Sequence, residues 1–278
     1  TPKELYAGGQ GFSADDLKLV GNTAKALRMA GLSVKELFDA GYSTEDLRMA
    51  KYSVRDLRSV DISALELYTK HSLTPHELWG AGYTVEDLKT AGVPVGDIRN
   101  VGATDTQLKG VGYTADELKA AGATAVTLSA AGYTAPELKG AGFSAEKLKD
   151  AGFSPIELRS AGFSAKVLEL AGFGGQHLKA AGFRAKELKE CGLKPSTVFS
   201  LAELKKEGFT PKELLEEGFP LKELVTVCTI TELRKAGKEA KELHKIGIPV
   251  KQLREGGFTA HQLKEAGFAV QELKKGGF

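Results

Sequence analysis

A repeat of ten residues runs through the whole chain and constrains its fold more than any other feature. From Ala141 the sequence reads AGFSAEKLKD, AGFSPIELRS, AGFSAKVLEL, AGFGGQHLKA and AGFRAKELKE, and the same frame extends in both directions. Written from its aromatic residue, the unit is F-[S/T]-A-x-E-L-K-x-A-G. About 28 units follow one another with no other sequence between them. Each unit must therefore form one small structural element that packs on its neighbours.

The residues of the unit predict a short capped helix. A hydroxyl such as that of Thr114 accepts a hydrogen bond from a free N–H of the first turn, and the acid three residues later, Glu117, returns the bond. The aromatic before the cap, Tyr113, and the leucine, Leu118, have the spacing of a hydrophobic staple. The basic residue after the leucine suits the negative end of the helix dipole, and a closing glycine such as Gly142 suits a left-handed corner. Proline stands at the expected first helical position at Pro2, Pro75, Pro155, Pro195 and Pro211.

A helix of about seven residues cannot be stable alone, because isolated helices need roughly 12–15 residues to be even marginal in water. The apolar stripe of alanine, leucine and aromatic residues must be buried against the next units. The sequence therefore predicts an all-α fold, an α-solenoid in which about 28 short capped helices stack, one for each ten-residue repeat. The pattern leaves open whether the helices alternate in two layers or always bend the same way.

The array resembles natural tandem-repeat scaffolds of the α-solenoid type over its full length, although its unit is much shorter than the roughly 33–47 residues of the familiar helical repeats. The resemblance implies an elongated binding or spacer protein and no catalytic residue. Because the chain begins inside a unit at Thr1 and stops on an aromatic at Phe278, we expect a fragment of a longer array or one flanked by other domains.

Irregular spacing divides the array in two. Residues 1–192 form a regular solenoid with a slip near 70–73, and residues 193–278 continue it after an irregular segment, 193–208, with a second slip near 225–232. The segment 193–208 is expected to be a kink or a longer helix, and a hinge is one interpretation of residues 193–232. Lys51 and Asp61 replace the closing glycine, which should strain or loosen those corners.

The sequence has no pattern typical of an enzyme, a metal site or a cofactor site. The two cysteines, Cys191 and Cys228, are far apart, and the five histidines show neither an H-x-x-x-H pair nor a neighbouring cysteine pair. Glycine is abundant, but it lies at helix ends rather than in a phosphate-binding loop. We therefore expect a non-enzymatic protein without cofactors.

A row of basic residues makes nucleic-acid binding the main alternative. The row consists of Lys109, Lys119, Lys139, Lys149, Arg159, Lys179 and Lys189. On one edge of a superhelix these side chains would form a phosphate-binding stripe despite a net charge of only +2. Capping acids form an equally long row, however, and the helix dipole already accounts for the bases.

Protein or peptide binding is the preferred function, with an elongated spacer as its variant and end-to-end self-assembly as a further alternative. The candidate contact residues are Leu19, Met29, Phe38, Met49 and Trp79. The alternative for the first four is that they face the next layer, and for Trp79 that it fills the gap left by the slip.

No apolar run approaches the roughly 20 residues of a membrane span, and no signal peptide is visible. Low cysteine use and the absence of an N-x-S/T sequon favour the cytoplasm, although an extracellular bacterial array would have the same features.

Overall fold

The computed structural model describes residues 12–278, and every regular element in that range is a short helix. The chain divides into two compact units, Thr1–Gly142 and Phe143–Phe278. Each unit is a solenoid-like stack with one helix for nearly every ten residues, so the predicted all-α fold is confirmed. The predicted first repeat, with Pro2 and Leu5, lies outside the described residues.

The helices follow the repeat frame closely. In the first unit they are α2 (Ala14–Leu19), α3 (Ala24–Met29), α4 (Val34–Asp39), α5 (Thr44–Met49), α6 (Val54–Ser59), α7 (Ala64–Thr69), α8 (Pro75–Gly80), α9 (Val85–Thr90), α10 (Val95–Asn100), α11 (Asp105–Gly110), α12 (Ala115–Ala120), α13 (Ala125–Ala130) and α14 (Ala135–Gly140). In the second unit they are α15 (Ala145–Asp150), α16 (Pro155–Ser160), α17 (Ala165–Leu170), α18 (Gly175–Ala180), α19 (Ala185–Glu190), the 3₁₀ turn η1 (Pro195–Thr197), α20 (Leu201–Lys206), α21 (Pro211–Glu216), α22 (Leu221–Leu224), α23 (Ile230–Lys235), α24 (Ala240–Lys245), α25 (Val250–Glu255), α26 (Ala260–Glu265) and α27 (Val270–Lys275).

The predicted capping box begins most of these helices. In α12 the Thr114 hydroxyl accepts a hydrogen bond from the Glu117 N–H at 3.3 Å, and the Glu117 carboxylate accepts one from the Thr114 N–H at 2.7 Å. These bonds, first the one from the Thr114 backbone, hold the pKa of Glu117 below its ordinary value. The helix then ends at Ala120, since Ala121 is its C-cap and Gly122 takes a φ of +84°. Nearly all the helices are six residues long, slightly shorter than the expected seven.

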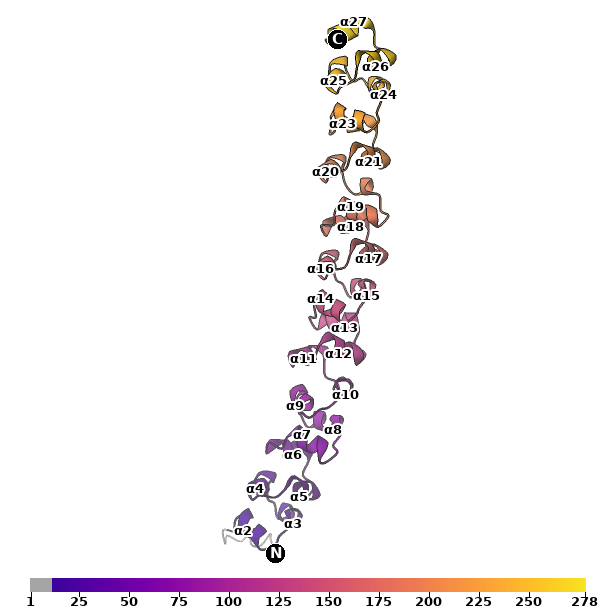
Figure 1. Ribbon diagram of the computed structural model, residues 1–278. Coiled ribbons are helices and arrows are strands. Elements are labelled where there is room, and N and C mark those ends of the chain that lie inside the picture. The colour runs from indigo at the N-terminus through magenta and orange to yellow at the C-terminus, as the bar shows by residue number, and fades with distance from the viewer. Residues whose placement is uncertain (1–11) are drawn as a thin grey trace. The chain divides into compact units, whose positions relative to one another are not determined.

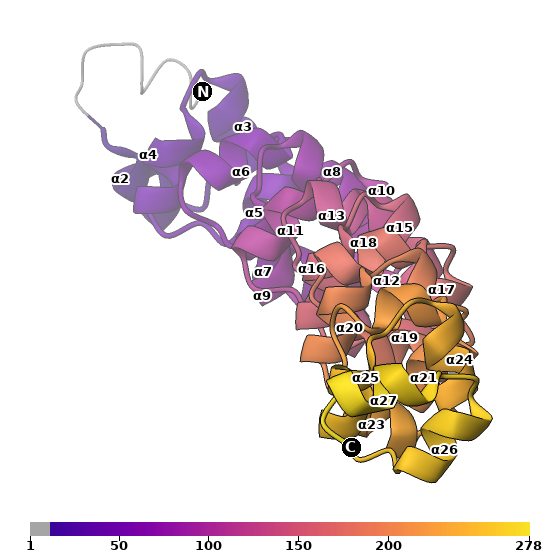
Figure 2. The ribbon, with the colours of Figure 1, turned by 90° about the horizontal axis from the view of Figure 1, so that it is seen from above.

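Successive helices alternate between two sides of each unit, which answers the question that the sequence left open. In the first unit α2 and α4 lie on one side and α3 and α5 on the other (Figure 1). In the second unit α24 and α26 lie opposite α25 and α27 (Figure 2). Helices two apart in the chain pack together, as α3 does with α5 and α24 with α26. Each repeat therefore contacts both the next repeat and the one after it.

The repeat leucine forms the centre of each stack. Leu118, Leu128 and Leu138 in the first unit are completely buried, as are Leu148 and Leu158 in the second. The alanine three residues before the leucine and the aromatic residue before the cap are mostly buried around it. Burying a leucine side chain contributes roughly 1.5–3 kcal/mol to the free energy of folding. The row of buried leucines therefore offsets the conformational entropy that the chain loses, which a single short helix could not do.

In the described part of the first unit, three corners turn without glycine. Lys51, Asp61 and Ser72 adopt left-handed φ values of +68°, +59° and +53°. Ser72 belongs to the one-residue insertion between α7 and α8, where the Leu73 N–H still reaches the Leu67 carbonyl at 3.1 Å. The insertion therefore lengthens one corner and leaves the stacking frame in place.

The irregular stretches of the second unit are compact turns. Residues 195–197 form η1 rather than a longer helix, and Phe199 after it is buried. At the later slip α22 has only four residues, and the Cys228 N–H bonds the Leu224 carbonyl at 2.8 Å before Thr229 caps α23. Over residues 12–278, no helix has the length and apolar character needed to cross a membrane.

Candidate interaction surface

The basic residue that follows the repeat leucine joins each repeat to the helix two repeats further on. Lys119 lies in the last turn of α12, and its Nζ donates to the carbonyl of Ala141, the C-cap of α14, at 2.6 Å. In the second unit Arg159 of α16 donates to Ala181, the C-cap of α18, at 2.9 Å. A cation at the end of a helix compensates the helix dipole and bonds carbonyls that have no partner within the helix. We call this contact the cation tie.

The same cation also lies over the aromatic ring two residues after that carbonyl, at the start of the following repeat. The Arg159 guanidinium is 4.9 Å from the centre of the Phe183 ring, and Lys89 Nζ is 4.4 Å from that of Tyr113. Desolvated contacts of this type are worth up to about 2 kcal/mol, and exposed ones about 0.5–1. Further ties from cation to carbonyl join Lys18 to Ala40, Arg28 to Ala50, Lys89 to Val111, Arg99 to Ala121 and Arg254 to Gly277.

Six residues of the predicted phosphate-binding row contact carbonyls, carboxylates or rings of their own unit. Lys109 donates to the carbonyl of Gly132, and Lys149 donates to Ala171 and Gly172, both at 2.9 Å. The ties of Lys119 and Arg159 are described above. Lys179 donates to the Val198 carbonyl and to Glu203. Lys189 forms an ion pair with Glu217 and lies over the Phe209 ring. Lys139 occupies the same position of its repeat. The row is thus built into the stack.

Tyrosine hydroxyls supply a second connection in the opposite direction. Tyr42 donates to the carbonyl of Asn22 at 2.6 Å, and Tyr133 donates to that of Tyr113 at 2.5 Å, each twenty residues back. Burial raises the pKa of both phenols, so they stay neutral donors near neutral pH. These two repeats therefore carry a hydrogen bond that a phenylalanine at the same position could not make.

Four of the candidate contact residues are exposed to solvent. Leu19, Met29 and Met49 expose 86%, 78% and 68% of their surface and occupy the same position of α2, α3 and α5. Because α3 packs on α5, the two methionines stand at equivalent places on contacting helices. Phe38 is more than one third exposed.

Trp79 occupies the position of the tie cation, so an indole replaces the cation at this place in the array. It is half-buried, and its Nε1 comes within 3.8 Å of the place where a side chain on Gly102 would begin. This is the corner that a cation tie from position 79 would reach.

Grooves lie between the repeats of the described residues. Three of them, of about 440, 470 and 400 Å³, have equivalent linings: a basic residue, the helix cap that follows it, and the aromatic and capping residues two repeats later. The corresponding sets are Lys109, Thr114, Tyr133 and Glu137; Arg58, Ser63, Tyr83 and Asp87; and Arg234, Glu239, Phe258 and Gln262. The surface repeats one kind of groove.

The cysteines and histidines are dispersed through the array. Cys191 and Cys228 are free and buried, and burial raises the pKa of both thiols, which disfavours the reactive thiolate. Among residues 12–278 no group of three His, Cys, Asp or Glu side chains is arranged to hold a metal ion.

Sequence reasoning placed each basic residue near the end of its own helix but missed its partner. The partner is a carbonyl about 22 residues away. Every residue has a backbone carbonyl, so the residue types do not show which one accepts the hydrogen bond. A signal was nevertheless present, because a basic residue and an aromatic recur 24 residues apart, as in Arg159 and Phe183.

Comparison with known proteins gives one match. The family described as the decapeptide repeat region matches residues 2–72, 72–145, 132–199 and 227–278. No curated protein and no solved structure matches the chain.

Proposed function

The chain belongs to the decapeptide repeat family, and on that premise we propose that it is a non-enzymatic scaffold that binds a protein or peptide partner through exposed side chains of its first unit. In the spacer variant, the array binds no partner and only keeps the parts attached to it at a distance from each other. Both interpretations accord with a surface that repeats equivalent grooves, since catalysis needs differing polar groups that converge in one pocket.

The observation that carries the proposal is the exposure of Met29 and Met49 at equivalent positions of the contacting helices α3 and α5. Methionine is flexible and polarizable, and it is overused at surfaces that adapt to partner side chains. Leu19 and Phe38 extend the candidate surface to α2 and α4, and Trp79 is a separate candidate anchor on α8.

Affinity capture followed by direct titration tests this surface. Wild-type protein and a Met29→Ser, Met49→Ser variant are used to capture partners, and each captured protein is purified and its Kd measured. If the partner buries both methionines, each serine should reduce the binding free energy by about 1 kcal/mol. The Kd of the variant would then be at least tenfold weaker. The matched control replaces Val126 and Ile156 by serine, since these apolar side chains are also more than half exposed but lie elsewhere. Equal Kd values for all three proteins would reject the surface, and absence of any partner would favour the spacer.

Nucleic-acid binding and self-assembly are the alternatives that the same samples test. Because the cations of the basic row are engaged in ties, we expect labelled oligonucleotides to show weak anisotropy changes at about 50 mM salt. Micromolar binding that collapses at about 200 mM salt would instead support the phosphate stripe. An apparent mass that rises with concentration would support end-to-end stacking.

A further inference from the structure

One groove of the second unit is lined by three cations that have no partner in the fold. The groove has a volume of about 490 Å³, and residues of α19 and α20 form its walls together with the ring of Phe199. Arg184 and Lys186 belong to the start of α19, and Lys206 is the last residue of α20. All three are exposed, and within residues 12–278 their side chains make no hydrogen bond or ion pair.

This concentration of basic residues is specific to the groove and is not part of the repeat frame. Two of the grooves described above have equivalent linings, so the three positions can be compared directly. The corresponding residues are Thr114, Asp116 and Gly140 in the groove of about 440 Å³, and Glu239, Lys241 and Glu265 in the groove of about 400 Å³. The two other grooves thus have one lysine between them at places where this groove has three cations.

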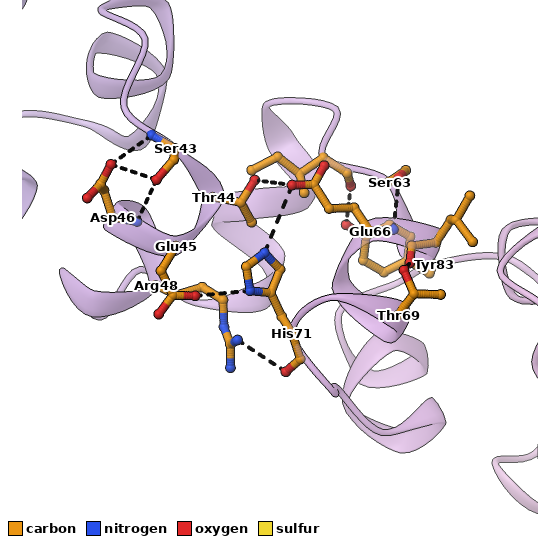
Figure 3. Close-up of polar contacts among 12 residues, drawn as sticks. Ser43, Thr44, Glu45, Asp46, Arg48, Ser63, Glu66, Thr69, His71 and Tyr83 are labelled. Atoms are coloured by element: carbon orange, nitrogen blue, oxygen red, sulfur yellow. Dashed lines mark hydrogen bonds and ion pairs between the residues drawn. The ribbon is translucent and has the colours of Figure 1, made fainter.

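Arg184 stands at the N-cap of α19, where most repeats have a hydroxyl. In α5, for example, the Ser43 hydroxyl accepts from the Asp46 N–H at 3.1 Å, and the Asp46 carboxylate accepts from the Ser43 N–H at 3.0 Å (Figure 3). A guanidinium cannot accept, so α19 keeps only the second of these bonds, from the Arg184 N–H to Glu187 at 2.7 Å. The arginine therefore costs the helix a capping bond and leaves a guanidinium in the groove.

The two acids of the groove already have partners within the protein. Glu203 is paired with the Lys179 ammonium at 2.9 Å, and Glu207 accepts from an N–H in the first turn of α19 at 2.8 Å. Outside the groove, the charge of Lys186 contributes to the lowered pKa of Glu213, but hydrogen bonds from that acid's own N-cap residue are the main cause. The three cations of the groove therefore remain available to an added anion.

We propose that this groove binds one phosphate monoester carried by a partner polypeptide. A phosphate monoester has a charge of about −1.5 to −2 at pH 7 and three acceptor oxygens, so it matches three cations better than a carboxylate does. A nucleic acid needs phosphate contacts at many places along the array, whereas the row that includes Lys119 and Arg159 is bonded to carbonyls. Only the source of the phosphate rests on the scaffold function; the site itself can be tested without a partner.

Titration with inorganic phosphate at constant ionic strength tests the groove, with the amide NMR signals of residues 184–186 and 206–207 as the readout. We expect saturable shifts with a Kd in the millimolar range. Arg184→Ser introduces the usual capping residue, so it should fold, and it should weaken binding about tenfold through loss of a charge-assisted hydrogen bond.

A pair of lysines at the same position of their repeats provides the matched control. Lys186→Gln should weaken phosphate binding several-fold, whereas Lys241→Gln removes an equally exposed charge from a groove that also contains Glu239 and Glu265 and should leave the Kd unchanged. Equal Kd values for these two variants, or wild-type signals that do not saturate, would overturn the proposal.

A second titration identifies the source of the phosphate. A glycine-serine peptide with one phosphoserine should shift the same signals and compete with inorganic phosphate, and the unphosphorylated peptide should do neither. Micromolar binding of a single-stranded oligonucleotide that is weakened both by Lys186→Gln and by Lys109→Gln would assign the groove to a nucleic acid and refute a polypeptide partner. Neither titration involves the methionines of the first unit, so failure of that surface would leave these outcomes unchanged.

Discussion

Arg159 and Ala181 are joined by a 2.9 Å hydrogen bond from a guanidinium to the carbonyl that ends a helix two repeats away. The same guanidinium covers the ring of Phe183 in the next repeat unit. One side chain thus caps a helix, balances its dipole and packs on an aromatic ring. This contact adds to the buried leucines in stabilising repeats of ten residues, which are too short to fold alone.

Removing a cation tie should destabilise its unit. We expect Arg159→Met to lower the free energy of unfolding by about 1–2 kcal/mol, because a charge-assisted hydrogen bond and a cation–π contact are lost while the apolar stem is kept. Urea denaturation followed by circular dichroism measures the change. Lys35→Met is the control, since Lys35 pairs only with Asp39 in an exposed contact worth at most about 0.5 kcal/mol. Equal losses in the two variants would show that the tie adds nothing.

The left-handed corners without glycine are places where stability can be gained. Asp61→Gly should stabilise the protein by about 0.5–1 kcal/mol, since a left-handed conformation costs most residues roughly 1–2 kcal/mol and the greater freedom of glycine in the unfolded chain offsets part of the gain. Thermal unfolding gives the comparison. The reverse change, Gly182→Ala, should destabilise the protein, because its φ is +88° and the new Cβ would lie against the Arg159 guanidinium. A lower Tm for Asp61→Gly would contradict this account.

Two apolar residues of α13 should differ sharply in their contribution to stability. Leu128 is fully buried and Val126 is 56% exposed. We expect Leu128→Ala to cost about 2–5 kcal/mol through lost contacts and a cavity, and Val126→Ala to stay within about 0.5 kcal/mol. Chemical denaturation of the two variants tests whether the repeat leucine is the principal core residue. Similar costs would show that the core is not centred on the leucines.

Acid should weaken the second unit through a capping carboxylate. The Lys205 ammonium, 2.6 Å from the carboxylate, and the Thr229 N–H hold the pKa of Glu232 at about 2. A depressed pKa means that the stabilisation is complete above the ordinary value near 4.5 and is lost as the pH falls toward 2. Stability measured between pH 5 and 2 should therefore decline less steeply in Glu232→Gln than in the wild type. In Lys205→Met the pKa of Glu232, followed by carboxyl NMR, should rise, and an unchanged value would remove the lysine as the cause.

The sequence by itself determined the local structure of each repeat. The capping box of Thr114 and Glu117 spans three residues, and the corner at Gly122 follows directly from the closing glycine. These interactions depend on neighbours in the chain and on allowed backbone angles, so a ten-residue pattern is enough to specify them. The number and kind of elements could be predicted for the same reason.

Only the tertiary structure decided what the charged side chains contact. Whether Lys119 faces a phosphate or the carbonyl of Ala141 depends on how α12 stacks on α14, and stacking follows from packing that the repeat pattern leaves open. His71 likewise meets Glu45 only because α5 and α7 bring together residues that are far apart in sequence. The residue letters do not show which backbone carbonyl a side chain meets or how the helices are placed, so the cation ties became visible only once the repeats were stacked.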